Sequence, residues 1–357
     1  MSGMRTIPPT LPDLFSFDEI IDVRSPAEFA EDHIPGAINC PVLDDAQRIE
    51  VGTLYKQVSP FEAKKVGAAL VSANIARHLA ERFRDRPREW KPLIYCWRGG
   101  NRSGSMTTVF RAIGWKASQL DGGYKVWRAH VIAGLEAVPA QFRFLVVCGS
   151  TGSAKTRVLQ AIGALGEQIL DLETLAAHKG SVLGVMPGQP QPTQKWFETC
   201  LLDALQGFDP ARPVFVEAES RKIGRMHVPQ ALIGQIRAGA CLQVEATLPA
   251  RVEFLLRDYD YFIADPALLA PRLDALRELQ SRETLERWHE LAAHAAWPDL
   301  VRELLELHYD PLYQRSQERN FAGFGSPASF ATGDLSPAGI AALAERIVDY
   351  ARTAQMA

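Results

Sequence analysis

Several features that place a protein in a specialised class are missing from this sequence. Its 39 basic and 42 acidic residues give a formal net charge of −3. No overall positive charge therefore points to nucleic acid, and an RNA partner would need a local basic patch. No apolar stretch reaches the length of a membrane span, and Met1–Glu19 lacks the apolar core of a secretory signal. We therefore expect a cytoplasmic protein without a membrane partner.

Cysteine is scarce, and its spacing argues against two further classes. The five cysteines are odd in number and lie far apart, and none forms a Cys-x-x-Cys pair: Cys40, Cys96, Cys148, Cys200 and Cys241. This pattern indicates neither a disulfide framework nor a thiolate zinc site, and it fits a reducing compartment. We interpret Cys40 as a buried apolar residue rather than a second reactive thiol.

The chain is long enough for two domains with separate cores. It has 357 residues, of which 47% are hydrophobic and 23% are charged, the composition of a globular protein. Glu136–Ala140 has the character of a link between domains. We predict a first domain over residues 1–137 and a second over residues 138–357.

The segment around Cys96 is the most informative part of the first domain. The apolar run Leu93–Tyr95 predicts a strand that delivers Cys96 into the loop Cys-Trp-Arg-Gly-Gly-Asn-Arg-Ser, and Ser103–Ile113 can form a helix. The backbone N–H groups of such a loop and the N-terminus of the helix lower the pKa of a thiol and make it a nucleophile. The predicted catalytic residues are the thiol, two loop glycines and an arginine: Cys96, Gly99, Gly100 and Arg102.

Strands and helices alternate along the first domain. Strands are expected at Glu19–Arg24, near Ile38 and at Leu93–Tyr95, and helices at Ala63–Phe83 and Val126–Leu135. This alternation predicts an α/β fold in which helices cover both faces of a parallel sheet. Cys96 would then lie at the carboxyl end of a strand, where such sheets place their sites.

The second domain opens with a pattern typical of a P-loop. Phe142–Cys148 predicts a buried strand, a loop rich in glycine and serine follows, and Arg157–Leu165 is helical. Loop N–H groups would bind a diphosphate, Lys155 would offset its charge, and Thr156 could ligate Mg²⁺. Ala154 stands where the usual pattern has glycine. The predicted phosphate-binding residues are Gly149, Ser150, Thr151, Gly152, Ser153, Ala154, Lys155 and Thr156.

Two carboxylates follow the apolar strand Pro213–Val216. In a P-loop fold such a strand often ends in an acidic ligand for a metal or a water molecule, so Glu217 and Glu219 are candidates for this role. The alternative is a strand end with solvated charges, and the sequence favours neither interpretation.

Two further segments are expected to shape the second domain. The proline-broken loop Gly188–Gln194 enters a helix, and with Met186, Trp196 and Phe197 it could line an apolar pocket. Leu268–Leu307 has the pattern of an amphipathic helical region with mixed charge.

Four motifs of the first domain resemble those of the rhodanese family. They are Asp22–Arg24 with Glu28–Phe29, His33–Ala37, the cysteine loop, and Leu120–Gly123 followed by Trp127. In rhodaneses the loop cysteine carries a persulfide sulfur. The loop here has one residue more between cysteine and arginine than many sulfur-transferring rhodaneses, and it is similar to that of related cysteine phosphatases. The resemblance therefore implies a bulky oxyanion as reagent, while loop length alone does not separate a phosphatase from a transferase.

Nearly the whole chain, from about Asp18 to Tyr313, resembles the tRNA 2-selenouridine synthases. The resemblance rests on the order of the two domains and on four further motifs: Val51–Gln57, Pro190–Gln194, Val216–Gly224 and His308–Pro311. It implies a rhodanese-like domain followed by a P-loop domain with a helical C-terminal extension. It also implies that the substrate is a tRNA carrying a wobble 2-thiouridine.

What this resemblance implies is a two-step exchange without a tightly bound cofactor. The 2-thio sulfur is first alkylated by geranyl diphosphate, with Lys155 and Thr156 stabilising the leaving diphosphate. Selenium from selenophosphate then replaces the S-geranyl group. In that step Cys96 would attack selenium, with phosphate departing, and carry a perselenide, while Arg102 and the loop amides hold the anions. A selenophosphate-producing enzyme is an expected partner.

The surface that binds tRNA is expected near the second domain's basic residues, Arg221, Lys222 and Arg225, together with the segment Arg315–Phe321. Two alternatives remain open from the residues. One is a rhodanese-type cysteine phosphatase or sulfurtransferase fused to a P-loop kinase, and the other is a sulfur carrier that only binds partners.

Overall fold

The computed structural model describes residues 11, 13–181, 183–186, 188–313 and 321–353, and its chain divides into two compact units. The first unit extends to Gly134 and includes Glu198–Asp203, and the second contains Leu135–Phe197 and the chain from Ala204 onward. The α/β fold class expected from the sequence is confirmed. The domain boundary between residues 137 and 138 stays a prediction.

The first unit is built on a small parallel sheet with the strand order β2-β1-β3-β4. The strands are β1 (Glu19–Asp22), β2 (Ile38–Asn39), β3 (Pro92–Tyr95) and β4 (Ser118–Gln119). All four residues of β3 are buried, as expected of a central strand covered on both faces. Cys96 directly follows β3 and lies at the carboxyl edge of this sheet.

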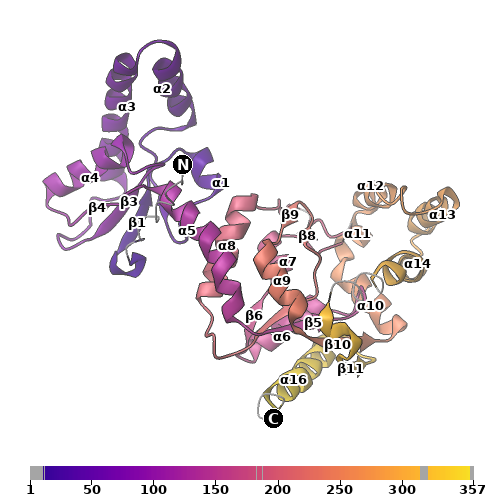
Figure 1. Cartoon of the computed structure of the whole chain (residues 1–357). Helices are drawn as coiled ribbons and strands as arrows, with labels where there is room; N and C mark the ends of the chain where they lie inside the picture. Colours follow the sequence, from indigo (N-terminus) through magenta and orange to yellow (C-terminus); the bar gives the residue numbers. More distant parts are fainter. Residues whose placement is uncertain (1–10, 12, 182, 187, 314–320, 354–357) are drawn as a thin grey trace, which may run out of the picture. The chain divides into compact units, whose positions relative to one another are not determined.

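Five helices accompany this sheet in the described part of the first unit: α1 (Pro26–Glu31), α2 (Asp45–Gln57), α3 (Pro60–Glu81), α4 (Asn101–Ile113) and α5 (Tyr124–Ala137). Helices α2 and α3 run side by side (Figure 1). The core between sheet and helices includes an aromatic group in which Trp90 and Phe110 each lie 5.0 Å from Trp115 between ring centroids, edge to face. Such pairs add roughly 0.5–1.5 kcal/mol to the burial of their apolar surface.

The second unit has a five-stranded parallel sheet with the order β11-β10-β5-β7-β6. Its strands are β5 (Phe144–Cys148), β6 (Gln168–Leu170), β7 (Val214–Glu217), β10 (Ala240–Ala246) and β11 (Ala328–Thr332). Strand β5 is central and all five of its residues are buried. The loop after β5 therefore begins at the middle of the carboxyl edge, where ligands bind in open parallel sheets.

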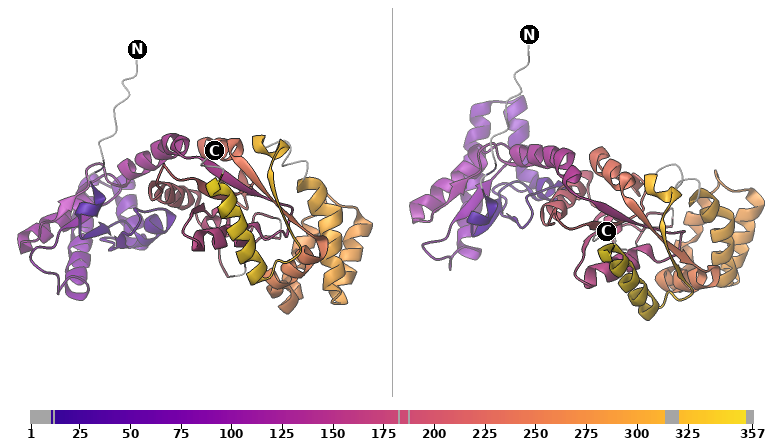
Figure 2. Two further views of the ribbon diagram at one scale, coloured as in Figure 1. Left: turned by 90° about the horizontal axis from the view of Figure 1, so that it is seen from below. Right: turned by 60° about the horizontal axis from the view of Figure 1, so that its bottom comes forward.

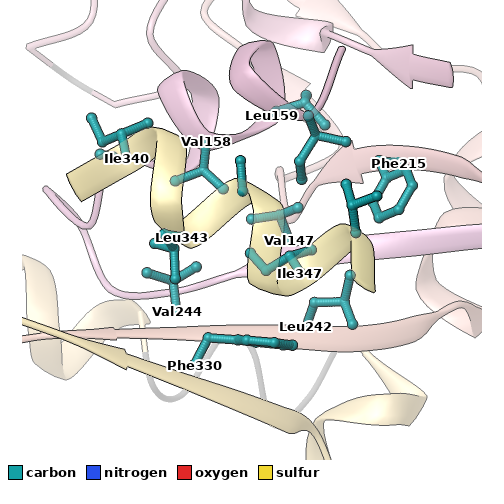
Figure 3. Packing of buried hydrophobic residues seen from close by; sticks show 14 of the residues in the cluster. Val147, Val158, Leu159, Phe215, Leu242, Val244, Phe330, Ile340, Leu343 and Ile347 are labelled. Carbon is teal, nitrogen blue, oxygen red and sulfur yellow. The ribbon is translucent and has the colours of Figure 1, made fainter. Parts of the chain in front are cut away.

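One face of this sheet is covered by α6 (Lys155–Ala164) and α16 (Pro337–Thr353). Figure 3 shows Ile340, Leu343 and Ile347 of α16 among apolar side chains of α6 and of the strands. Since these side chains are almost fully buried, each contributes about 1.5–3 kcal/mol by leaving water. This packing fixes α6, and with it the end of the loop that precedes α6.

The remaining helices of the second unit are shorter on average. They are α7 (Leu172–Ala176), α9 (Gln230–Ala238), α10 (Leu248–Asp258), α11 (Asp260–Ala264), α12 (Ala270–Asp274), α13 (Arg282–Ala293), α14 (Trp297–Leu304) and the two ends of α8 (Gln194–Gln206), whose middle belongs to the first unit. Helices α11–α14 lie together beside the sheet (Figure 2). A two-stranded antiparallel hairpin, β8 (Lys222–Ile223) and β9 (Met226–His227), follows β7. Among the described residues, no helix is long and apolar enough to cross a membrane.

The amphipathic pattern over Leu268–Leu307 is divided into separate helices. Ser281 begins α13 by accepting a hydrogen bond from the backbone N–H of Thr284, and Ala295 interrupts the chain with a positive φ of 54° before α14. The apolar positions still face one another, because Trp288 of α13 and Leu300 of α14 are buried in the same cluster.

Candidate functional sites

The loop that carries Cys96 is held by the turn between β4 and α5. The N–H of Tyr124 donates to the carbonyl oxygen of Cys96 at 2.8 Å, and a Cβ atom at Gly123 would overlap that same oxygen. Gly99 has a positive φ of 64°, and a Cβ there would lie 2.5 Å from the carbonyl oxygen of Leu120. Glycine is required at both positions because the two loops approach backbone to backbone. The Leu120–Gly123 motif thus supports the cysteine loop.

The surroundings of Cys96 favour its thiolate. Burial would raise the pKa of the thiol, but a hydrogen bond from Ser103 Oγ at 3.1 Å, backbone N–H groups of Ser103 and Arg98, and the charge of Arg102 together lower it below its ordinary value. Gln119 in turn donates to Ser103 Oγ at 2.9 Å and to the carbonyl oxygen of Gly99. A thiol whose pKa is lowered by such donors is a candidate nucleophile.

Arg102 lies at the start of α4 and is engaged by a carboxylate. Its Nη1 donates to Oε2 of Glu28 at 2.6 Å and its Nη2 to Oε1 at 3.2 Å. Burial opposes ionisation of Glu28, but the hydrogen bonds and charge of Arg102 outweigh it and lower the pKa of this carboxyl. The sequence placed Arg102 near the thiol but did not identify Glu28 as its partner. Gly100, the fourth predicted residue, is the N-cap of α4.

The second site is the loop between β5 and α6, which has the predicted strand–loop–helix context. Gly149 and Gly152 both have positive φ angles, 154° and 81°, and a Cβ at Gly149 would lie 2.9 Å from the carbonyl oxygen of Val244. Ala154 adopts the left-handed conformation, with φ 59° and ψ 28°, directly before α6. Alanine therefore takes the conformation for which glycine is usually selected, at a cost of roughly 1–2 kcal/mol.

Lys155 folds back over this loop. Its Nζ donates to the carbonyl oxygen of Gly149 at 2.7 Å and makes a longer contact, 3.4 Å, with that of Ser150. Burial lowers the pKa of Lys155, while the nearby carboxylates of Glu219 and Glu173 favour its charged form. This ammonium group lies beside the loop N–H groups, as expected of a P-loop lysine.

Thr156, the next residue, donates its hydroxyl to Oε2 of Glu173 at 2.6 Å. Glu173 follows β6 at the start of α7, and its backbone N–H donates to Oε1 of Glu217 at 2.9 Å. Among the described residues, no group of three or more histidine, cysteine or acidic side chains has the arrangement of a metal site. A Mg²⁺ ion at Thr156 stays a prediction.

The two carboxylates after β7 differ in their surroundings. Glu217 is fully buried, with one oxygen bound to the N–H of Glu173, and burial followed by the charges of Asp171 and Glu173 raises its pKa well above the ordinary value. Glu219 lines the cavity at the loop between β5 and α6, residues 149–154, which is called the phosphate loop below. Burial, followed by the charge of Glu173, raises the pKa of Glu219 to about 8. Glu217 thus supports α7, and Glu219 faces the site.

Two residues from distant parts of the chain complete the phosphate loop. The backbone N–H of Gly149 donates to Oη of Tyr313 at 2.6 Å, and Lys155 Nζ lies 5.2 Å from the centroid of the Tyr313 ring. Arg251 of α10 donates to the carbonyl oxygen of Thr151 at 2.9 Å and forms a two-pronged ion pair with Asp310. Sequence patterning could not identify Tyr313 or Arg251 as site residues, because their separation in sequence leaves no periodic signal.

Two cavities adjoin this loop. The larger, of about 610 Å³, is lined by Lys155, Thr156 and Glu219 among others, and the smaller, of about 70 Å³, is lined mostly by apolar side chains. Met186 lines the larger cavity as expected, whereas Trp196 and Phe197 line neither. The expected apolar pocket around Trp196 is therefore not the one beside the loop. Gln191 of the proline-broken loop accepts from the N–H of Arg225 at 2.8 Å and so fixes the β8–β9 hairpin.

The predicted tRNA contacts lie on and beside this hairpin. Arg221, Lys222 and Arg225 are exposed. Lys222 and Arg225 line a third, open cavity of about 590 Å³, which shares His178, Gly180 and Ser181 with the cavity at the phosphate loop. Of the segment Arg315–Phe321, only Phe321 belongs to the described residues, and it is buried.

Comparison with known families agrees with both halves of this description. Residues 10–130 match the rhodanese-like domain family, and residues 142–269 match the family described as tRNA 2-selenouridine synthase AAA domain.

The chain is also similar to proteins named tRNA 2-selenouridine synthase. It is 34% identical to one from Alcanivorax borkumensis over 82% of this chain and 88% of that protein, and 35% identical to one from Cupriavidus necator over 85% and 89%. It is 36% identical to one from Nitrosomonas europaea over 67% of this chain and 63% of that protein. With a prepared thiol in one unit, a phosphate loop in the other and this similarity along most of its length, the chain belongs to the tRNA 2-selenouridine synthase family.

Proposed function

We propose that this chain replaces the sulfur of a wobble 2-thiouridine in tRNA by selenium, using geranyl diphosphate and selenophosphate as substrates. The observation that supports the proposal is that two separate loops each have groups suited to hold an anion. One holds a nucleophilic thiol at Cys96, and the other holds a lysine beside an apolar cavity. A simple sulfurtransferase would need only the first site.

The phosphate loop serves the alkylation step. The 2-thio sulfur of the uridine attacks carbon 1 of geranyl diphosphate, the C–O bond breaks, and diphosphate leaves with its electron pair. Lys155 and the loop N–H groups stabilise the charge that develops on the leaving group. Glu219 in its protonated form adds no negative charge beside the leaving diphosphate.

Cys96 acts in the selenium step, and the electron balance determines which atom of selenophosphate its thiolate attacks. The perselenide expected from the sequence, formed with release of phosphate, would require an acceptor for two electrons, because selenium in selenophosphate is already at the selenide level. In a balanced route, selenium stays at the selenide oxidation level. The Cys96 thiolate attacks phosphorus, the P–Se bond breaks, and hydrogen selenide leaves with the electron pair.

The exchange at the base then needs no further reagent. Hydrogen selenide attacks carbon 2, the bond from carbon 2 to sulfur breaks, and geranylthiolate leaves and takes up a proton. Water cleaves the S–P bond on Cys96 and releases phosphate. Ser103, whose hydroxyl donates to Cys96 Sγ, stabilises the thiolate both as attacking and as leaving group. Arg102 and the loop amides hold the phosphoryl oxygens.

The wobble base approaches the phosphate loop from the side of the β8–β9 hairpin in this proposal. Lys222 and Arg225 line a cavity that shares residues with the one at the loop, so phosphates of the anticodon can be held beside it. The proposed reaction uses no tightly bound cofactor, and it requires a second enzyme that makes selenophosphate.

The test is mass spectrometry of wobble nucleosides after incubation of the protein with 2-thiouridine tRNA, geranyl diphosphate and selenophosphate. The proposal predicts S-geranyl-2-thiouridine when selenophosphate is omitted and 2-selenouridine when both are present. The same protein is assayed with an aryl phosphate and with ATP in the absence of tRNA. Turnover of both, without any modified nucleoside in the first assay, would instead support a cysteine phosphatase fused to a kinase.

A further inference from the structure

We propose that the smaller apolar cavity beside the phosphate loop receives the distal end of the isoprenoid chain of the diphosphate substrate, while the rest of the chain lies in the larger cavity, and that side chains of α14 limit the length of chain accepted. This inference rests on the proposed use of geranyl diphosphate. It adds where the chain lies and which residues select it.

The lining of this cavity fits a hydrocarbon. Its volume of about 70 Å³ has room for the last few carbon atoms of a chain, and no charged residue lies in its lining. Most of its walls are leucine, isoleucine, valine and aromatic side chains from α10, α11, α14 and the turns beside them, including Leu255, Leu256, Ile263, Leu300, Val301 and Leu304. A phosphate group would lose its hydration there without gaining a partner, whereas an alkyl chain gains by leaving water.

The cavity adjoins the larger cavity at the phosphate loop. Thr151 of the phosphate loop, Ser181, Leu255, Tyr259 and Tyr309 line both cavities. The loop and α10 also meet closely, since a Cβ atom at Gly152 would lie 2.8 Å from Cδ1 of Leu255. One ligand can therefore place its charged head at Lys155 and its apolar tail between α10 and α14.

The junction is held in place by polar contacts outside the apolar lining. Arg251 of α10 binds the carbonyl oxygen of Thr151 and the carboxylate of Asp310. These contacts fix α10 against the phosphate loop on one side and against the chain that follows α14 on the other. The distance from the head site to the apolar walls is thus set by the fold, as selection of chain length requires.

The walls of the cavity on α14 would limit the length of the isoprenoid chain. Leu300 and Leu304 are almost fully buried, at 1% and 5% exposure, and belong to the packed cluster around Trp288. A longer chain would have to displace them. Val301 lines the cavity but is only half-buried, so its size can be changed with little disturbance of that cluster.

The experiment compares dissociation constants for inorganic diphosphate, dimethylallyl diphosphate, geranyl diphosphate and farnesyl diphosphate by isothermal titration calorimetry. The variants are Val301→Phe, which narrows the cavity, and Val301→Ala, which widens it. Leu291→Phe is the matched control, because Leu291 packs against the same cluster but does not line the cavity. Thermal unfolding of each variant shows that the fold is retained, and Leu256→Phe repeats the narrowing on α10.

Val301→Phe is expected to weaken binding of geranyl diphosphate about tenfold, since each CH₂ group that stays in water costs about fourfold in affinity. Binding of inorganic diphosphate stays within about twofold of the parent in this variant. Val301→Ala is expected to strengthen binding of farnesyl diphosphate relative to geranyl diphosphate. Leu291→Phe is expected to leave unchanged both the affinity ratio of geranyl to inorganic diphosphate and that of farnesyl to geranyl diphosphate.

Two results would overturn the assignment of the cavity. One is that Val301→Phe weakens binding of geranyl and inorganic diphosphate equally, and the other is that neither Val301→Phe nor Leu256→Phe changes the affinity for geranyl diphosphate. A different result addresses the proposed function itself. If the parent protein binds geranyl diphosphate no more tightly than inorganic diphosphate, then the isoprenoid substrate is wrong, and the cavity assignment falls with it.

Discussion

The hydroxyl oxygen of Tyr313 accepts a hydrogen bond from the backbone N–H of Gly149 at 2.6 Å, across 164 positions of sequence. This N–H belongs to the loop that is expected to bind diphosphate, so the phenol occupies a donor that the substrate also needs. If the proposed diphosphate accepts from this N–H, Tyr313 competes with it for one hydrogen bond.

Tyr313→Phe should bind inorganic diphosphate about twofold to thirteenfold more tightly, because the hydrogen bond lost from the ligand-free protein contributes about 0.5–1.5 kcal/mol. Titration calorimetry measures this change. Tyr350→Phe, at an exposed residue of α16, is the control and should leave affinity unchanged. Weaker binding by Tyr313→Phe would show that the phenol contacts the bound diphosphate instead of competing with it.

Ser103→Ala should raise the pKa of the Cys96 thiol, because the hydroxyl that donates to the sulfur is lost. We expect the pH profile of Cys96 alkylation by iodoacetamide to shift to higher pH, with a rate several-fold lower at neutral pH. Peptide mass spectrometry distinguishes Cys96 from the other four cysteines. Ser105→Ala is the matched control, because Ser105 lies on the same helix but donates to the carbonyl oxygen of Asn101. A profile shared by both variants would exclude the proposed role of Ser103.

Gly123→Ala should displace the cysteine loop, because the new methyl group would overlap the carbonyl oxygen of Cys96 and the residue has a positive φ of 57°. We expect a loss of more than about 2 kcal/mol in the free energy of unfolding and a slower alkylation of Cys96. Denaturant unfolding measures the first effect. Gly104→Ala adds a methyl group that meets Gln119 only at ordinary contact distance and should be tolerated.

Binding of inorganic diphosphate should weaken as the pH rises through about 8. Glu219 is protonated and neutral below this pH in the folded protein, and above it carries a negative charge beside Lys155 and the incoming anion. Glu219→Gln should remove this component of the pH dependence, while titration of the diphosphate itself remains in both proteins. Identical pH profiles for parent and variant would contradict the role assigned to Glu219.

The adduct formed on Cys96 separates two chemical routes. Incubation with selenophosphate followed by acid quench and peptide mass spectrometry should give a phosphoryl group on Cys96, without the many-isotope pattern of selenium. Cys96→Ser, which lacks the thiol, is the negative control. A selenium pattern on Cys96 would support the perselenide expected from the sequence and would require that an electron acceptor, or release of phosphite, be identified.

Local patterns were sufficient for the central strands β3 and β5 and for the two loops that follow them. The buried run that became β5 and the glycine-rich loop after it form a strand, turn and helix whose signals all lie within about twenty residues. The same holds for β3, Cys96 and α4. The family match supports this part of the prediction, because both domains were expected in their observed order.

Partners that come from distant segments could not be predicted in this way. Glu28, Glu173 and Tyr313 each meet a predicted residue only because the sheets bring separate loops to one edge. Ala154 shows a different limit, since its left-handed backbone contradicts the usual preference of alanine and is held by the loop and α6 together. The placement of the apolar cavity likewise depends on how α10 and α14 pack, which periodicity alone does not give.

The central claim is that alkylation and selenium transfer use separate sites in one chain. Its most direct test is wobble-nucleoside mass spectrometry of Cys96→Ser and Lys155→Met, each given 2-thiouridine tRNA with geranyl diphosphate or S-geranyl tRNA with selenophosphate. We expect that Cys96→Ser still forms S-geranyl-2-thiouridine but no 2-selenouridine, and that Lys155→Met shows the reverse. Loss of both activities in each folded variant, or selenium transfer by Cys96→Ser, would contradict it.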